Sequence, residues 1–96
     1  MTEIETLKNL IGQIDSFISG KVTSSDPDFR AWKSLVERFL QRKYGKDGQE
    51  VEWFKKLRFS LAVPGLTQKE YVDACARKLQ EVKVVLNSYL NELEEG

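Results

Sequence analysis

The chain has 96 residues, of which 41% are apolar, 10% aromatic and 31% charged. A chain of this size supports one hydrophobic core, and this composition excludes a disordered protein, so we expect a single domain over residues 1–96. Fifteen basic and fifteen acidic side chains give a formal net charge of zero. The molecule as a whole therefore has no field that would draw it to nucleic acid or anionic lipid.

The residue types that usually carry catalysis are either absent from this chain or lie where a structural role is expected. Histidine is absent, which removes the usual base for a nucleophile and the commonest zinc ligand. Cys75 is the only cysteine and lies on an apolar helical stripe, where a thiol is a small core residue. The carboxylates fall at helix starts and on polar faces, without metal-ligand spacing. We expect no catalytic residues, no cofactor and no metal, and hence no enzyme. An enzyme of unfamiliar type stays open as a third hypothesis, because carboxylate chemistry does not require histidine.

Two features bear on location. The first residues carry acids where a signal peptide has bases, and no apolar run approaches the roughly 18 residues of a membrane span. A single cysteine also forms no disulfide within the chain. These features predict a soluble, cytoplasmic protein with no membrane partner.

The first helix is expected from about Thr2 to Ser19. Thr2 and Glu5 have the spacing of a capping box, and Gly20 is placed to end the helix in the left-handed conformation. Apolar residues step by three and four between these ends, which is the repeat of one helical face. They are Ile4, Leu7, Ile11, Ile14 and Ile18, with Leu10 and Phe17 widening the face.

The second helix is expected to begin at Asp26-Pro27-Asp28, which supplies an N-cap, a proline at the first helical position and an acid near the positive end of the dipole. Tyr44-Gly45 should end it. Its expected inner face is apolar and rich in aromatic residues. That face comprises Phe29, Trp32, Val36, Phe39 and Leu40.

The third helix is expected from about Gly48, because Asp47 and Glu50 repeat the cap-and-acid spacing. It should continue until Pro64-Gly65 stops it. The residues expected to face inward are Val51, Phe54, Leu57 and Leu61.

The fourth helix should be the longest element. Thr67 and Glu70 form another capping-box spacing, and no glycine or proline follows until Gly96. About 28 residues give a helix of about 42 Å, against about 27 Å for the first helix, so part of it should project beyond its partner. Short connections favour antiparallel neighbours, and we predict an all-α fold, a single four-helix bundle with a long C-terminal helix.

The length mismatch suggests where a partner would bind. We predict a protein-interaction module that forms a homodimer through the projecting end of the fourth helix, with a contribution from the first helix. The residues expected to carry self-association are Leu86, Tyr89, Leu90 and Leu93.

The middle of the chain offers a second surface. Residues 29–60 hold nine basic and four acidic side chains among several aromatic ones, a pattern seen in single-strand nucleic-acid binding. The core spacing of most of these aromatic residues and the acids between the bases favour a solvated face instead. Trp53 and Phe59 lie off the inner stripe, so either one is an exposed anchor or the helix is wedged between two others. The possible partner surface comprises Arg38, Arg42, Lys43, Trp53, Lys55, Lys56 and Phe59, with Lys46 added for nucleic acid.

Several short pieces of the sequence also point to a known group of proteins. They are Asp28-Phe29-Arg30-Ala31-Trp32, then Phe39-Leu40 and Tyr44-Gly45, then Phe54-Lys55-Lys56-Leu57-Arg58-Phe59, and finally Tyr71-Val72 ahead of a long amphipathic segment. Over about Leu10 to Leu93 the chain resembles small helical modules at the N-termini of bacterial phage-defence proteins, of the abortive-infection (AbiTii-like) and TIR-like sensor kinds. The resemblance implies a bundle used for oligomerisation or partner recognition, no catalytic residues, and an origin in a phage, prophage or defence locus.

Overall fold

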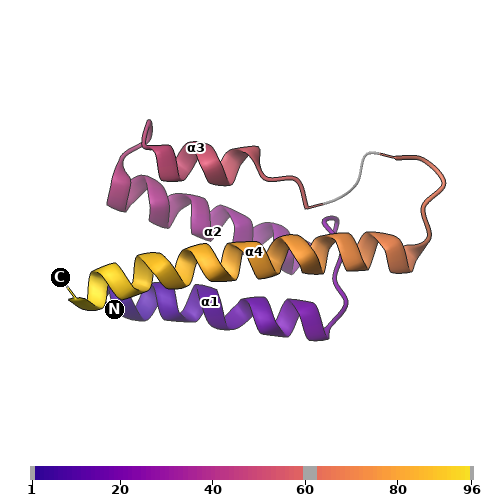
Figure 1. Ribbon diagram of the computed structural model, residues 1–96, viewed down its shortest axis with the longest axis horizontal. Coiled ribbons are helices and arrows are strands. Elements are labelled where there is room, and N and C mark those ends of the chain that lie inside the picture. The colour runs from indigo at the N-terminus through magenta and orange to yellow at the C-terminus, as the bar shows by residue number, and fades with distance from the viewer. Residues whose placement is uncertain (1, 60–62, 96) are drawn as a thin grey trace.

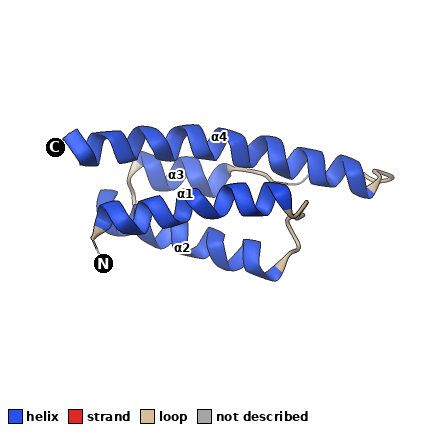
Figure 2. Cartoon of the chain, turned by 90° about the horizontal axis from the view of Figure 1, so that it is seen from below, coloured by secondary structure: helices blue, strands red, loops and turns tan. Residues whose placement is uncertain are grey.

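The structure is a computed structural model that describes residues 2–59 and 63–95 (Figure 1). Its four helices are α1 (Glu3–Ser19), α2 (Pro27–Tyr44), α3 (Gln49–Lys56) and α4 (Gln68–Glu95), and the described residues contain no strand. Successive helices run up and down beside one another, with α4 extending the full length of the molecule (Figures 1 and 2). The predicted four-helix bundle with a long C-terminal helix is confirmed.

The helices form a ring that is closed on three sides. α1 packs against both α4 and α2, and α2 packs against α3. Between α3 and α4, by contrast, no two Cα atoms of the described residues lie within 8 Å of each other. The two helices meet there only through large side chains such as Trp53 and Tyr89, and we call this the open side of the ring.

The core is built from the predicted inner faces. Trp32 of α2 is 1% exposed, and its indole Nε1 donates a hydrogen bond to the Leu10 carbonyl of α1 at 2.9 Å. Phe17 and Phe29 each lie 5.7 Å from the Trp32 ring, measured between ring centroids. Aromatic contacts of this kind add about 0.5–1.5 kcal/mol per pair beyond the area they bury. The α1–α2 side is therefore fixed by both packing and a buried hydrogen bond.

Three helix starts use the side chains that the sequence indicated. The Thr2 hydroxyl accepts from the Glu5 amide, and Asp26 accepts from the Asp28 and Phe29 amides. At α4, Thr67 and Glu70 form the reciprocal capping box, each accepting from the backbone N–H of the other. Such caps stabilise a helix by about 1 kcal/mol each.

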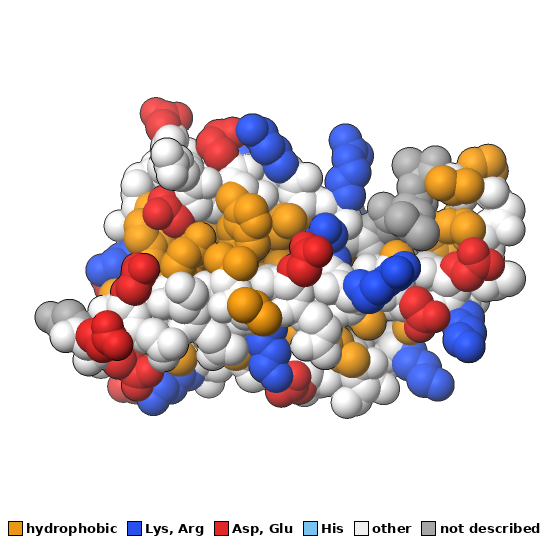
Figure 3. All heavy atoms as spheres, in the orientation of Figure 1, with side chains coloured by type: hydrophobic (Ala, Val, Ile, Leu, Met, Phe, Trp, Pro, Cys, Tyr) orange, Lys and Arg blue, Asp and Glu red, His pale blue; other side chains and the backbone are white. Residues whose placement is uncertain are grey.

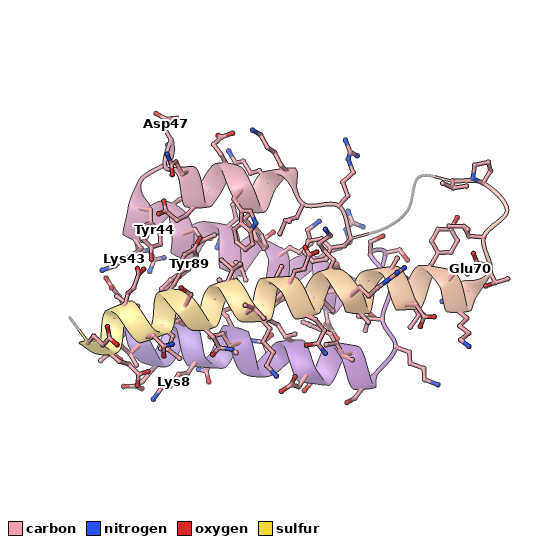
Figure 4. The ribbon with its side chains drawn as sticks, viewed as in Figure 1. Lys8, Lys43, Tyr44, Asp47, Glu70 and Tyr89 are labelled. Atoms are coloured by element: carbon pink, nitrogen blue, oxygen red, sulfur yellow. The ribbon has the colours of Figure 1, made fainter. Side chains whose placement is uncertain are left out.

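The predicted cap of α3 is wrong. Gly48 is the N-cap residue and no side chain caps this helix, while Asp47 points away from the bundle (Figure 4). α3 still begins close to the predicted residue.

The predicted end of α3 is also wrong, because the helix stops at Lys56 and Leu57 is already extended (φ −67°, ψ 136°). In a continuing helix Phe59 would lie about 140° around the axis from Phe54 and would miss the core. The extended backbone instead brings the Phe59 ring to 5.0 Å from that of Phe29. Burying one phenylalanine contributes about 2 kcal/mol, which favours this break. Leu61, predicted for the inner face, lies outside the described residues.

The end of α1 differs from the prediction by one residue. Gly20 keeps right-handed geometry (φ −78°), and Lys21 takes the left-handed conformation (φ 55°). The Val22 amide then donates to the Phe17 carbonyl at 3.3 Å, which is the long hydrogen bond of a Schellman motif. Gly20 lies close to the preceding helical turn, because a Cβ there would be 3.2 Å from the Ser16 carbonyl oxygen, a tight contact.

Candidate functional site

The residues predicted for self-association do not form one exposed surface. Leu86 and Leu90 are buried in the core of the single chain, so the prediction that they meet a second copy is wrong. Tyr89 and Leu93 are only partly buried. α4 does project beyond α1, but the longer projection is at its N-terminal end (Figures 1 and 2). At its C-terminal end Glu94 lies 3.7 Å from Lys8 near the start of α1.

The open side between α3 and α4 holds a cluster of three partly exposed aromatic residues, Tyr44, Trp53 and Tyr89, which we call the aromatic seam. The Tyr89 ring lies 5.4 Å from Tyr44 and 6.4 Å from Trp53, between centroids. Figure 3 shows apolar side chains gathered on this face between α3 and α4, with charged groups around them. Figure 4 shows Tyr44 and Tyr89 side by side in the same place.

The polar atoms of the aromatic seam are available to a partner. The two tyrosine hydroxyls and the Trp53 indole N–H form no hydrogen bond with any residue that the structure describes. None of these three atoms is buried, so all of them are accessible to solvent. Partial burial raises the pKa of Tyr44 and Tyr89, and the nearby carboxylates Glu50 and Glu92 raise it further. Both hydroxyls therefore stay protonated and can donate hydrogen bonds at neutral pH.

The predicted partner surface is divided between two sides of the molecule. Trp53, Lys55 and Lys56 are on α3, and Lys55 lies 3.9 Å from Glu37 of α2. Phe59 is buried, so its prediction as a surface residue is wrong. Its ring is covered by the Lys33 ammonium group, 5.1 Å from the ring centroid.

The other three members of that surface lie on α2. Arg38 and Arg42 line a groove between α1 and α2, and Lys43 lines a smaller hollow beside it together with Arg42. This α1–α2 groove has a volume of about 280 Å³. Its walls are polar side chains of α1 and the arginines of α2, with apolar side chains between them. The lining residues are Thr6, Asn9, Leu10, Gln13, Leu35, Arg38, Phe39 and Arg42.

Cys75 offers no reactive thiol. It is completely buried on α4, and burial raises the pKa of its thiol to about 11, so it carries almost no thiolate at neutral pH. Its prediction as a core residue is confirmed. Among residues 2–59 and 63–95, no group of three or more acids and thiols is close enough to hold a metal ion.

Sequence reasoning missed two parts of these sites. Tyr44 was assigned only to the end of a helix, and its contact with Tyr89 depends on the tertiary arrangement of α2 and α4. Leu35 lies off the apolar stripe of α2 and is 48% exposed, making it one of few large apolar side chains at the surface. An apolar residue off the stripe was the signal that could have indicated the α1–α2 groove.

None of the helices in the described part of the chain is long and apolar enough to cross a membrane. Comparisons of the chain with protein-family models, with curated proteins and with solved structures find no match.

Proposed function

We propose that this protein is a non-catalytic protein-interaction module that associates with a second copy of itself through the aromatic seam. The observation that carries the proposal is the partly exposed cluster of Tyr44, Trp53 and Tyr89 on the open side of the helical ring. Aromatic residues with a packed face and a free polar atom are enriched in protein interfaces, because one side chain supplies both apolar area and a hydrogen bond.

A second copy fits this surface by charge. The first turn of α3 holds Glu50 and Glu52, whereas its last turn holds Lys55 and Lys56. A two-fold axis through the seam would pair two α3 helices antiparallel and set the acids of one copy against the lysines of the other. A formal net charge of zero adds no overall repulsion between copies.

Sedimentation equilibrium from low micromolar to near-millimolar concentration tests the proposal. We expect a concentration-dependent dimer whose affinity falls by about 2 kcal/mol, roughly thirtyfold, in Trp53→Ala, as for an aromatic residue central to an interface. Val84→Ala is the matched control, because Val84 is 71% exposed on α4 and lies about 140° around the helix from Tyr89. A wild-type monomer throughout this range would refute self-association.

A charge exchange tests the antiparallel arrangement. Glu52 and Lys56 are exposed, so their replacement leaves the core unchanged. Glu52→Lys and Lys56→Glu should each weaken the dimer, and the double variant should restore it. Each single variant also places like charges one turn apart on α3, at a cost of about 0.2–0.5 kcal/mol in helix stability, so thermal melts must accompany the association data. Loss without restoration would rule out the antiparallel pairing.

Nucleic-acid binding through Arg38, Arg42, Lys43, Lys46, Lys55 and Lys56 is the alternative, and it has less support. Lys43 and Lys55 lie 3.2 Å and 3.9 Å from Glu3 and Glu37. Most aromatic side chains of this region are buried, so they are not available to stack on bases. The alternative predicts a gel shift with oligonucleotides at low salt that weakens steeply as salt rises. No gel shift and unchanged tryptophan fluorescence at low salt would eliminate it.

A role in phage defence rests on the sequence resemblance alone. It predicts that the coding gene lies in a phage, prophage or defence locus. A gene neighbourhood without such genes would remove this part of the proposal and leave the interaction module as it stands.

A further inference from the structure

The α1–α2 groove and the α3–α4 side lie between different pairs of neighbouring helices in the ring. A smaller hollow of about 70 Å³ continues it, sharing Thr6, Phe39 and Arg42 with the main groove. The two together form a trough bounded by one helix on each side. Nothing in the proposed self-association requires this trough.

The walls of the groove are held in place before any partner binds. The buried hydrogen bond from Trp32 to the Leu10 carbonyl joins α2 to α1 directly beside it. Leu10 and Phe39 are buried and supply apolar atoms to the lining, while Leu35 is 48% exposed at the edge. An apolar side chain of a partner would cover Leu35 without rearrangement of the helices.

The charge of the groove selects the partner. Arg38 and Arg42 are four residues apart on α2, hence about 6 Å along its axis. Neither forms an ion pair with a residue that the structure describes, although five other cations do. Glu3, the one acid lining the trough, already pairs with Lys43 at 3.2 Å. The trough is therefore positively charged and lacks the carboxylates that its arginines could bind.

We infer that the α1–α2 groove is a docking site for an acidic amphipathic helix of a partner protein. Apolar residues of that helix at positions i, i+3 and i+7 would cover Leu35 and the Leu10–Phe39 lining, as in other helix-in-groove complexes. Carboxylates four residues apart on its flank would match the spacing of Arg38 and Arg42 and accept paired hydrogen bonds from the guanidinium groups.

A synthetic probe tests this inference without knowledge of the natural partner. The probe is a helix-forming peptide of about four turns, with leucine at the i, i+3 and i+7 positions and glutamate on the flanking positions. Its counterpart carries lysine in place of every glutamate. Backbone amide chemical shifts of the full chain are followed by NMR during titration with each peptide.

The acidic peptide should shift amides of residues that line the groove, including Gln13 and Leu35, and should bind more tightly than the lysine peptide. Arg38→Glu and Arg42→Glu should weaken acidic-peptide binding at least roughly tenfold, which is about 1.4 kcal/mol, and should favour the lysine peptide. Arg77→Glu, which makes the same charge change at an exposed position of α4, should have no effect.

Three results would overturn the inference. One is equal binding of both peptides, and another is peptide-induced shifts that map to the aromatic seam. The third is a shift of the same groove residues on dilution of the protein alone, which would identify a second copy as the occupant. Trp53→Ala should leave peptide binding intact, so failure of the groove and failure of the proposed self-association are separable.

Discussion

Trp32 and Trp53 lie on neighbouring helices but have different surroundings. Trp32 is buried, stacks on Phe29 and donates its indole N–H to a backbone carbonyl of another helix. Trp53 is partly exposed, and its indole N–H has no acceptor among the described residues. The first tryptophan is a structural residue whose every group is satisfied inside the chain. The second packs against Tyr89 and keeps part of its ring at the surface.

The reason for the difference is the shortness of α3. Its eight residues face an α4 of 28 residues, and the chain after Lys56 is extended. The α1–α2 and α1–α4 sides each join two long helices, and the short α3 packs closely against α2 alone. The α3–α4 side has no two Cα atoms within 8 Å of each other among the described residues. A four-helix bundle with one truncated helix therefore exposes part of the apolar face of its longest helix.

The largest expected effect is on the free energy of unfolding, which should fall much further when Trp32 is replaced than when Trp53 is replaced. Trp32→Ala should lower the free energy of unfolding by about 3–5 kcal/mol, because it leaves a large cavity in the core and removes the hydrogen bond to the Leu10 carbonyl. Trp53→Ala should cost only about 1–2 kcal/mol at concentrations where the protein is monomeric. Urea denaturation followed by circular dichroism measures both. Equal losses would show that Trp53 is as much a core residue as Trp32.

Alkaline pH gives the next largest effect and compares the core with the aromatic seam. Burial raises the pKa of Cys75 from 9.0 to about 11, so the unfolded chain loses this proton at a lower pH than the folded chain. Stability present below pH 9 should fall by up to about 2–3 kcal/mol as pH rises through 11. The raised pKa values of Tyr44 and Tyr89 act in the same direction.

The urea midpoint measured across this pH range tests the effect. Cys75→Ala should start from a lower stability and lose less of it at high pH, because only the tyrosine contribution remains. A thiol reagent should react with Cys75 only through unfolding, and therefore no faster than the chain unfolds. Rapid reaction in the native state would contradict a buried thiol.

The smallest effect concerns the turn that directly follows α1. Lys21 holds a left-handed backbone conformation (φ 55°), which costs a non-glycine residue roughly 1 kcal/mol. Lys21→Gly should raise the free energy of unfolding by about 0.5–1 kcal/mol, whereas Lys21→Ala should give no gain. Thermal melts of the three proteins decide this. A stabilised alanine variant would show that the lysine side chain, not the backbone, is unfavourable there.

Local sequence signals predicted much of the fold. The caps at Thr2, Asp26 and Thr67, the stop at Gly45 and the apolar repeats of α1, α2 and α4 all depend on residues within one helical segment, and the structure contains each of them. The end of α3 was missed because it is decided by a distant contact, the burial of Phe59 against Phe29 of α2. No local rule anticipates that contact.

The proposed interaction surfaces were less predictable for the same reason. Helix length indicated that α4 projects, but it did not indicate which residues the shorter helices leave uncovered. Leu86 and Leu90 have the same spacing as Tyr89 and Leu93, yet only the latter two remain partly exposed. Arg38 and Leu35 share a groove because α1 lies beside α2, which follows from packing and not from their own segment.

Trp53 itself gives the most direct test of the proposed self-association. Trp32→Phe leaves Trp53 as the only tryptophan, and Trp53→Phe leaves Trp32 alone. In the first variant, acrylamide quenching should become weaker and the emission should shift to shorter wavelength as protein concentration rises, because a second copy covers the aromatic seam. The second variant should be protected at every concentration. Quenching of Trp53 that stays the same from low micromolar to near-millimolar protein would contradict the account.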